Sequence, residues 1–140
     1  MKRIAVASLM LLAIGLTGCV AHVTASKDPD ADLTKLRTFY VKRLPADNRG
    51  IERVISRRLQ LMGHESSCGD LQAPPSGVDA FVTYEDRWNW DVTLFMSKLD
   101  IQVRDASTQS VLASGQSTRS STKRESPVDM VLEVLEEVFR

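Results

Sequence analysis

The stretch Lys98-Leu99-Asp100-Ile101-Gln102-Val103-Arg104 decides the fold, because every second side chain in it is apolar. Side chains with a period of two point to opposite faces of a strand, so this stretch predicts a β-strand with one buried and one wet face. The polar group Ser107-Thr108-Gln109 then predicts a turn into a second strand over 110–118. An antiparallel pair is therefore expected here.

Two more strands are predicted upstream of this pair. The segment from Leu36 to Arg43 is rich in β-branched and aromatic residues, and Pro45 ends it. The segment 79–86 places Ala80, Val82 and Tyr84 on one side. The residues between them, over 66–77, contain two glycines and two prolines and predict an irregular loop, which a short strand beginning at His64 can precede.

Two amphipathic helices are predicted. The first follows a cap at Asn48 and runs to about Met62, with apolar residues at steps of three and four, and Gly63 ends it. The second begins at Ser126-Pro127, a cap followed by a first-turn proline, and continues to the C-terminus. Its polar side is acidic, which favours a helix packed on a core over one lying on a membrane.

Together these elements predict an α+β fold. We expect a two-layer sandwich, in which two helices cover one face of a mostly antiparallel β-sheet of about four to five strands. Residues 34–140 then form a single domain, which fits the length of the chain. The other face of the sheet stays partly exposed.

The N-terminus predicts where the protein resides. Lys2 and Arg3 precede an apolar run of about a dozen residues, which is too short to span a bilayer and suits a secretory signal. The run closes on Leu16-Thr17-Gly18-Cys19, which resembles the lipobox of bacterial lipoproteins. The resemblance implies removal of residues 1–18 and attachment of diacylglycerol and further acyl chains to Cys19. The alternative is an ordinary signal peptide with a coincidental cysteine.

The resemblance also implies a location. Val20 stands where an inner-membrane retention signal has Asp, so we expect delivery to the outer membrane with the domain facing the periplasm. Several acyl chains on one cysteine anchor a protein stably. Residues 19–33 are small, polar and interrupted by Pro29, and they are predicted to form a flexible tether.

The net charge and the cysteine content limit the kinds of partner that can be expected. The chain has a formal net charge of zero, so loss of Lys2 and Arg3 leaves about −2, and no nucleic-acid partner is expected. With Cys19 acylated, Cys68 is unpaired in an oxidising compartment, and a buried inert thiol, an intermolecular disulfide and a reactive or metal-binding thiol all remain open. His64 and Cys68 alone do not make a metal site.

Beyond the lipobox, the chain resembles a family of small bacterial envelope lipoproteins that carry a domain of unknown function. The similar features are Thr38-Phe39-Tyr40 in the first strand, Leu59 to Gly63 at the helix end and the Asp79 to Tyr84 strand. The resemblance covers most of the mature chain and implies no activity. Phosphate-loop, nucleophile-elbow and His-Glu-x-x-His motifs are all absent from the sequence, so no enzyme, catalytic residue, metal or cofactor is expected.

The stretch Tyr84 to Asp91 is the best candidate for binding. Alternation places Trp88 and Trp90 on one side of an extended chain, where two indoles offer a stacking surface for a sugar, a peptidoglycan fragment or a protein. Asp86 and Asp91 flank them as hydrogen-bond acceptors. The alternative is that the indoles cover one end of the core.

Arg49, Arg53 and Arg57 recur at steps of four and stack along one helix face. Guanidinium groups make bidentate bonds to phosphate, so this row can contact phospholipid or lipopolysaccharide. The alternative is a solvated face with acidic counter-charges.

Three hypotheses follow for function. The first is an envelope interaction or accessory protein that docks onto another envelope protein through an exposed sheet face or edge, with Trp88 and Trp90 as anchor. The second is a binding module for peptidoglycan or lipid headgroups, which uses the same aromatics and the arginine row. An envelope hydrolase ranks last, because the required constellation of residues is missing.

Overall fold

A computed structural model describes residues 21–140, and the predicted signal peptide and Cys19 lie outside this range. Residues 21–140 form one six-stranded sheet and two α-helices, which confirms the predicted α+β class. The elements are β1 (Ala21–Lys27), the short 3-10 helix η1 (Leu33–Lys35), β2 (Thr38–Lys42), α1 (Ile51–Leu61), β3 (Glu65–Gly69), β4 (Ala80–Asp91), β5 (Thr93–Asp105), β6 (Val111–Arg119) and α2 (Pro127–Val138).

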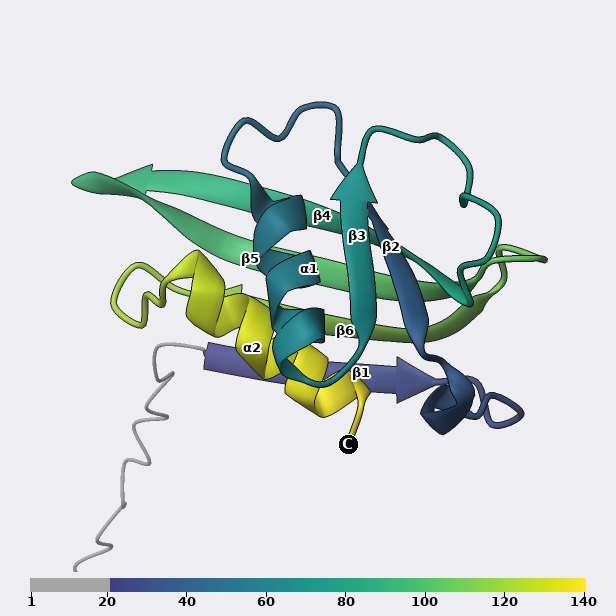
Figure 1. Ribbon diagram of the computed structural model, residues 1–140. Helices are drawn as coiled ribbons and strands as arrows, with labels where there is room; N and C mark the ends of the chain where they lie inside the picture. The colour runs from purple at the N-terminus through teal and green to yellow at the C-terminus, as the bar shows by residue number, and fades with distance from the viewer. Residues whose placement is uncertain (1–20) are drawn as a thin grey trace, which may run out of the picture.

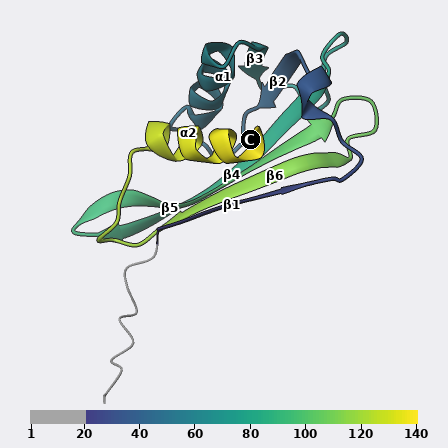
Figure 2. The ribbon, with the colours of Figure 1, turned by 90° about the horizontal axis from the view of Figure 1, so that it is seen from below.

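The strands lie in the order β1-β6-β5-β4-β2-β3 (Figure 1). The pairings of β1 with β6, β6 with β5 and β5 with β4 are antiparallel, whereas β2 runs parallel to both β3 and β4. The sheet is therefore mostly antiparallel, as predicted. Both helices cover the same face, and the opposite face carries no helix (Figure 2).

The predicted count of four to five strands, which includes the short strand at His64, was too low, because β1 has no apolar alternation and was not predicted. The tether predicted over 19–33 contributes β1, whose side chains are exposed except for the half-buried Val23. The loop predicted over 66–77 contributes most of β3, a polar edge strand. Ladder hydrogen bonds to a neighbouring strand, rather than burial of side chains, hold such edge strands.

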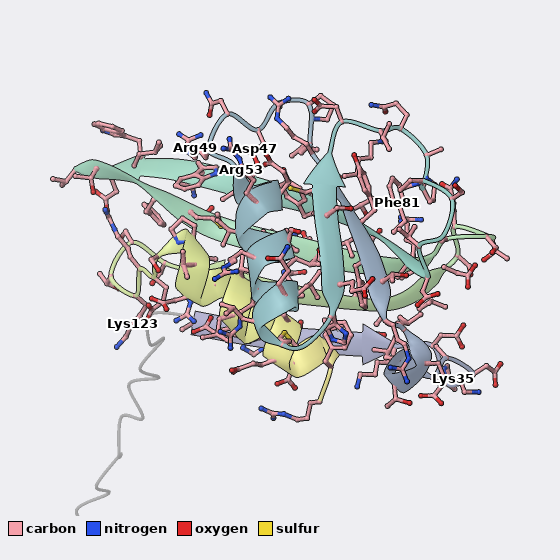
Figure 3. The ribbon with its side chains drawn as sticks, in the orientation of Figure 1. Lys35, Asp47, Arg49, Arg53, Phe81 and Lys123 are labelled. Atoms are coloured by element: carbon pink, nitrogen blue, oxygen red, sulfur yellow. The ribbon has the colours of Figure 1, made fainter. Side chains whose placement is uncertain are left out.

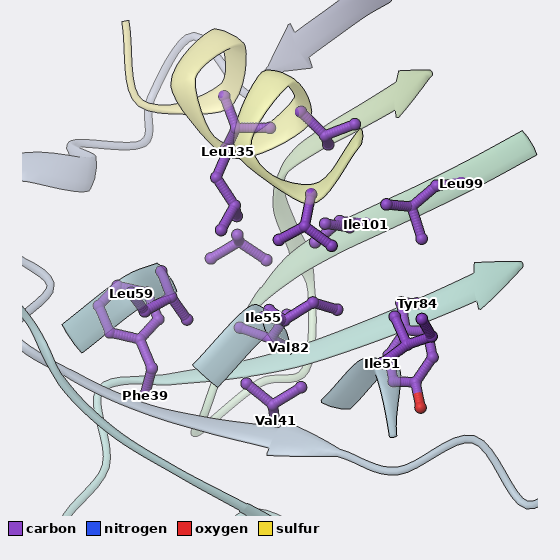
Figure 4. Packing of buried hydrophobic residues seen from close by; sticks show 14 of the residues in the cluster. Phe39, Val41, Ile51, Ile55, Leu59, Val82, Tyr84, Leu99, Ile101 and Leu135 are labelled. Atoms are coloured by element: carbon purple, nitrogen blue, oxygen red, sulfur yellow. The ribbon is translucent and has the colours of Figure 1, made fainter. Parts of the chain in front are cut away.

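The core lies between the sheet and the helices. Leu99, Ile101 and Val103 of β5 have no exposed surface and meet the apolar stripes of α1 and α2 (Figure 4). Gly115 of β6 lets α2 approach closely, since a Cβ atom there would lie 2.6 Å from a methyl group of Val138. The alternation that predicted this pair of strands thus faces the core as expected.

The helix starts are held by side chains. Ser126 accepts a hydrogen bond from the backbone N–H of Asp129 at 3.1 Å, as predicted for α2. At α1 the predicted cap at Asn48 was wrong, because the side chain that binds the free N–H groups is Asp47. Its carboxylate accepts from the N–H groups of Arg49 at 2.6 Å and Ile51 at 2.9 Å.

Asp47 also joins α1 to the sheet. The hydroxyl of Tyr84 on β4 donates to the Asp47 carboxylate at 2.6 Å and accepts from the N–H of Leu44 at 3.1 Å. Burial raises the pKa of Asp47, but these hydrogen bonds favour the carboxylate more strongly, so the net pKa is lowered. Burial and the same carboxylate raise the pKa of Tyr84.

Candidate functional site

The long β4–β5 hairpin extends beyond the part of the sheet that the helices cover (Figure 1). Its register shifts between Arg87 and Trp88, after which Trp88 pairs with Met96 and Trp90 with Leu94. The period of two keeps both tryptophans on one side of β4, as predicted. The hairpin therefore carries an aromatic edge past the end of the core.

The two tryptophans have different surroundings. Trp88 is half-buried and packs against the core cluster, whereas Trp90 is 75% exposed. The indole Nε1 of Trp88 donates to Asp86 at 2.7 Å, and the guanidinium carbon of Arg49 lies 4.1 Å from the centre of its ring. Both predicted interpretations thus apply, one to each residue: Trp88 covers the end of the core, and Trp90 offers a surface.

The turn of the hairpin adds apolar surface to Trp90. Val92 is 86% exposed and Leu94 43% exposed. Sequence reasoning missed both, although a turn that holds Val in place of Gly or Asn is itself a signal. Asp91 is exposed, and its side chain lies 3.9 Å from the guanidinium of Arg124, which also donates to the Asp91 carbonyl and the Thr93 hydroxyl.

The predicted arginine row does not act as one patch. Arg49 stacks on Trp88, Arg53 lies beside Glu52 with 3.5 Å between Nε and Oε1, and Arg57 contacts Gln60 at 3.4 Å (Figure 3). Only Arg49 is brought together with the aromatic stretch. All three arginines are exposed, so a solvated face describes Arg53 and Arg57 better than a phosphate cluster does, with Glu52 as the counter-charge of Arg53 and the neutral Gln60 beside Arg57.

A polar groove of about 530 Å³ lies over the helix-free face of the sheet. Its floor includes Thr83 and Glu85 of β4 and Asp100, Gln102 and Arg104 of β5. Arg104 is held by the carbonyl of Gln109 at 3.1 Å and by the Gln102 side chain. These are the wet positions of the alternating stretch, so the sequence indicated the polar face but not the groove.

Phe81 lines the same groove but offers it no stacking surface. Its ring is 2% exposed and lies parallel to that of Tyr40, with the two centres 5.9 Å apart. The Tyr40 hydroxyl accepts from the N–H of Leu71 in the loop between β3 and β4. The groove therefore suits a ligand that forms hydrogen bonds and carries charge.

Cys68 and His64 do not form a metal site. Cys68 is half-buried, and burial, followed by the nearby Glu52, raises the pKa of its thiol. His64 packs between Phe39 and Phe139, with ring centres 4.8 and 5.2 Å away, and burial lowers its pKa. Within residues 21–140, no three His, Cys, Asp or Glu side chains are grouped to hold a metal. The inert thiol is the interpretation that this environment favours.

No helix among the described residues has the length and apolar character needed to cross a membrane.

No protein-family model and no curated protein matches the chain. Among solved structures, it is similar to the PelC dodecamer from Paraburkholderia phytofirmans, with a TM-score of 0.61, 14% identity and coverage of 85% of this chain and 98% of that chain. A leucine-to-methionine variant of the same dodecamer gives a TM-score of 0.60, 13% identity and the same coverage. Identity this low shows a shared fold alone.

Proposed function

We propose that this chain is a lipid-anchored envelope protein, held by Cys19 at the periplasmic face of the outer membrane, where it serves as an interaction or accessory protein. The observation that carries the proposal is the pairing of Ala21 with Arg119 in β1, because Ala21 lies only two residues after the lipobox cysteine in the sequence. Two residues span about 7 Å of chain at most. Acylation of Cys19 would thus fix an edge strand of the sheet directly at the membrane surface.

This arrangement favours a docking protein over a free ligand carrier. Without a flexible tether, the domain keeps its helix-free face and its sheet edges in a restricted orientation relative to the membrane. The groove over that face presents Glu85, Asp100 and Arg104 to a partner. The structural likeness to PelC, which is solved as a dodecamer, makes a second copy of this chain one partner to test.

The experiment compares three forms of the full-length chain expressed in a Gram-negative host. Cys19→Ser removes the acylation site. Val20→Asp is the matched control, because it keeps the acylation site and introduces the residue that is expected to retain lipoproteins in the inner membrane. We expect an acylated N-terminal peptide by mass spectrometry and outer-membrane fractionation for the unchanged chain. Val20→Asp should shift to the inner membrane, and Cys19→Ser should carry no acyl group and should be lost from the outer-membrane fraction.

The proposal fails if the unchanged chain carries no acyl group and fractionates like Cys19→Ser. Light scattering of the detergent-solubilised protein then measures its oligomeric state, and crosslinking in the envelope identifies protein partners. A specific crosslink from Gln102 or Arg104 would support docking through the helix-free face.

A second candidate function is a binding module for peptidoglycan or lipid headgroups. The polar groove favours it, because hydroxyl, amide and carboxylate groups of peptidoglycan can pair with its amide, carboxylate and guanidinium side chains. The paired-tryptophan platform does not contribute, since Trp88 is covered by Arg49. Titration with soluble peptidoglycan fragments, compared between the unchanged chain and Arg104→Ala, tests this candidate.

A further inference from the structure

Apolar surface is concentrated at the turn of the β4–β5 hairpin. Of the seven large hydrophobic side chains that are exposed among residues 21–140, three lie between positions 90 and 94: Trp90, Val92 and Leu94. The other four are spread over the molecule, at Leu61, Leu71, Val111 and Val128. A cluster of this kind on a protruding hairpin marks a surface with a partner.

The backbone at the turn supports this reading. Val92 has a φ of 61°, in the left-handed region that Gly and Asn adopt easily and that a β-branched residue rarely adopts. Its side chain is 86% exposed, so packing within the domain does not offset the strain. A strained, exposed valine at a turn is explained if its side chain is buried against something outside the domain.

The register of the sheet places the anchor at the same end of the molecule. Ala21 pairs with Arg119, and the neighbouring Thr118 pairs with Lys98, so β1 begins where the hairpin leaves the rest of the sheet (Figures 1 and 2). From the level of Lys98 to the turn at Val92 the hairpin projects about 20 Å. If the strands are inclined to the membrane surface, the turn at Val92 and the first paired residue of β1, Ala21, can both reach that surface.

The side chains around the turn suit an interface between water and lipid. Trp is the residue most typical of the headgroup level, and Val92 and Leu94 add an apolar tip. Lys123 is exposed in the loop 120–126 at this end, and Arg124 ties that loop to the hairpin (Figure 3). The carboxylates of Asp91 and Glu125 balance these cations, so apolar contact rather than net charge carries the binding.

We infer that Trp90, Val92 and Leu94 insert at headgroup level into the same lipid leaflet that holds the acylated Cys19. The domain is then attached at two points, which fixes its tilt and turns the helix-free face in one direction. This inference rests on the proposed lipidation for its geometry. The affinity of the hairpin tip for lipid is separately measurable.

The two tryptophans of the chain make a built-in test. Trp88→Phe leaves Trp90 as the only tryptophan, and Trp90→Phe leaves Trp88, so excitation at a wavelength that tyrosine does not absorb reports on one indole at a time. Each full-length variant, purified with its native N-terminus, is reconstituted into phosphatidylethanolamine and phosphatidylglycerol vesicles that contain phospholipid brominated either near the headgroup or near the methyl end. We expect Trp90 to be quenched most by bromine near the headgroup, and at least twice as strongly as Trp88.

The Cys19→Ser protein, purified without the apolar residues 1–18, tests the tip of the hairpin without an anchor. We expect weak partition into the same vesicles, reduced about tenfold by Trp90→Ala because most of one indole is lost from the apolar contact. The matched control is Leu71→Ala, an exposed apolar residue in the loop between β3 and β4, and it should leave partition unchanged. If mass spectrometry shows Cys19 unmodified, the proposed function fails, while this arm still tests the tip.

Two results would overturn the inference. The first is equal access of acrylamide to Trp90 with and without vesicles. The second is that Trp90 is shielded from acrylamide but is not quenched by brominated lipid. If this shielding increases with protein concentration, the tip of the hairpin is buried in a contact between copies of the chain.

Discussion

The two ends of the β4–β5 hairpin share one ladder but have opposite surroundings. At the base, Tyr84 and Ile101 pair with each other and lie buried under the helices. At the tip, Trp90 and Leu94 also pair, and they are exposed. The alternation along β4 runs through both ends, although the register with β5 shifts between Arg87 and Trp88, and the two ends differ chiefly in whether a layer of helices covers them. Alternation in a sequence thus predicts which face a side chain takes, and burial depends on what lies over that face.

The sharpest test of this contrast uses two apolar residues of β5. Ile101→Ala is expected to lower the free energy of unfolding by about 3 kcal/mol, because it removes fully buried methyl groups and leaves a cavity. Leu94→Ala should cost less than about 1 kcal/mol, since nearly half of that side chain is already in water. Urea denaturation followed by circular dichroism measures both. Equal losses would mean that the tip is packed within the domain.

A second test addresses the polar contact that secures the base. Asp47→Asn is expected to lower the free energy of unfolding by about 2 kcal/mol at pH 7, because it weakens the bonds from Tyr84 and from two backbone N–H groups. The folded-state pKa of Asp47 is lowered, so its contribution is present above the unfolded-state value of about 3.8 and is lost as the pH falls through the folded-state pKa.

Denaturation measured between pH 7 and pH 2 checks this second prediction. The unchanged chain should lose stability on acidification, and the difference between it and Asp47→Asn should shrink. A difference that stays constant over this range would show that the carboxylate charge does not contribute. Asp91→Asn, at the tip, is the matched control and should show little change, since its side chain is exposed and 3.9 Å from Arg124.

A third test predicts a gain of stability at the tip. Val92→Asn should raise the free energy of unfolding by about 0.5–1 kcal/mol, because Asn adopts the left-handed backbone at lower cost than a β-branched residue. Thermal unfolding of the Cys19→Ser chain measures it. The same variant should bind vesicles less well, so stability and membrane affinity would move in opposite directions. A loss of stability would place Val92 in a contact within the domain.

The smallest effect is expected for Trp90. Trp90→Ala should change the free energy of unfolding by less than about 0.5 kcal/mol, since the side chain is 75% exposed. Trp88→Ala should cost clearly more, because Trp88 packs on the core and binds Asp86 and Arg49. Each substitution removes one of the fluorescent indoles, so the unfolding of both variants is followed by circular dichroism. Similar costs would contradict the division of roles between the two indoles.

The parts of the fold that were predictable are those in which burial leaves a period in the sequence. Leu99, Ile101 and Val103 predicted β5, and Ser126 with Pro127 predicted the start of α2. β1 was missed because an edge strand with polar side chains is held by backbone pairing, which has no sequence period, and β3 extends the short strand predicted at His64 into the predicted loop for the same reason. The cap predicted at Asn48 was wrong because α1 begins two residues later, after Gly50 with a φ of 75°, so that the side chain of Asp47 reaches the N–H of Ile51.

The sequence predicted which residues belong to the candidate site better than it predicted how they are arranged in space. Sequence pattern placed Trp88 and Trp90 on one side, as the structure does, but exposure depends on where α1 and α2 end. The arginine row was predicted from helical spacing, yet Arg49 alone meets the aromatic stretch, because it precedes α1 and is separated from it by Gly50 with a φ of 75°, whereas Arg53 and Arg57 lie on the helix. Distances between separate elements are set by tertiary packing, which a single sequence does not encode as a local pattern.

The direct entry from the N-terminus into β1 has a mechanical consequence. Seven residues of β1 pair with β6, and the hydrogen bonds of an antiparallel ladder lie across the strands. A pull on Ala21 along the strand axis therefore loads all these bonds in shear at once, whereas a pull at right angles would open them one after another. With an anchor at Cys19, tension that drags the domain along the membrane and tension that lifts it away would meet very different resistance.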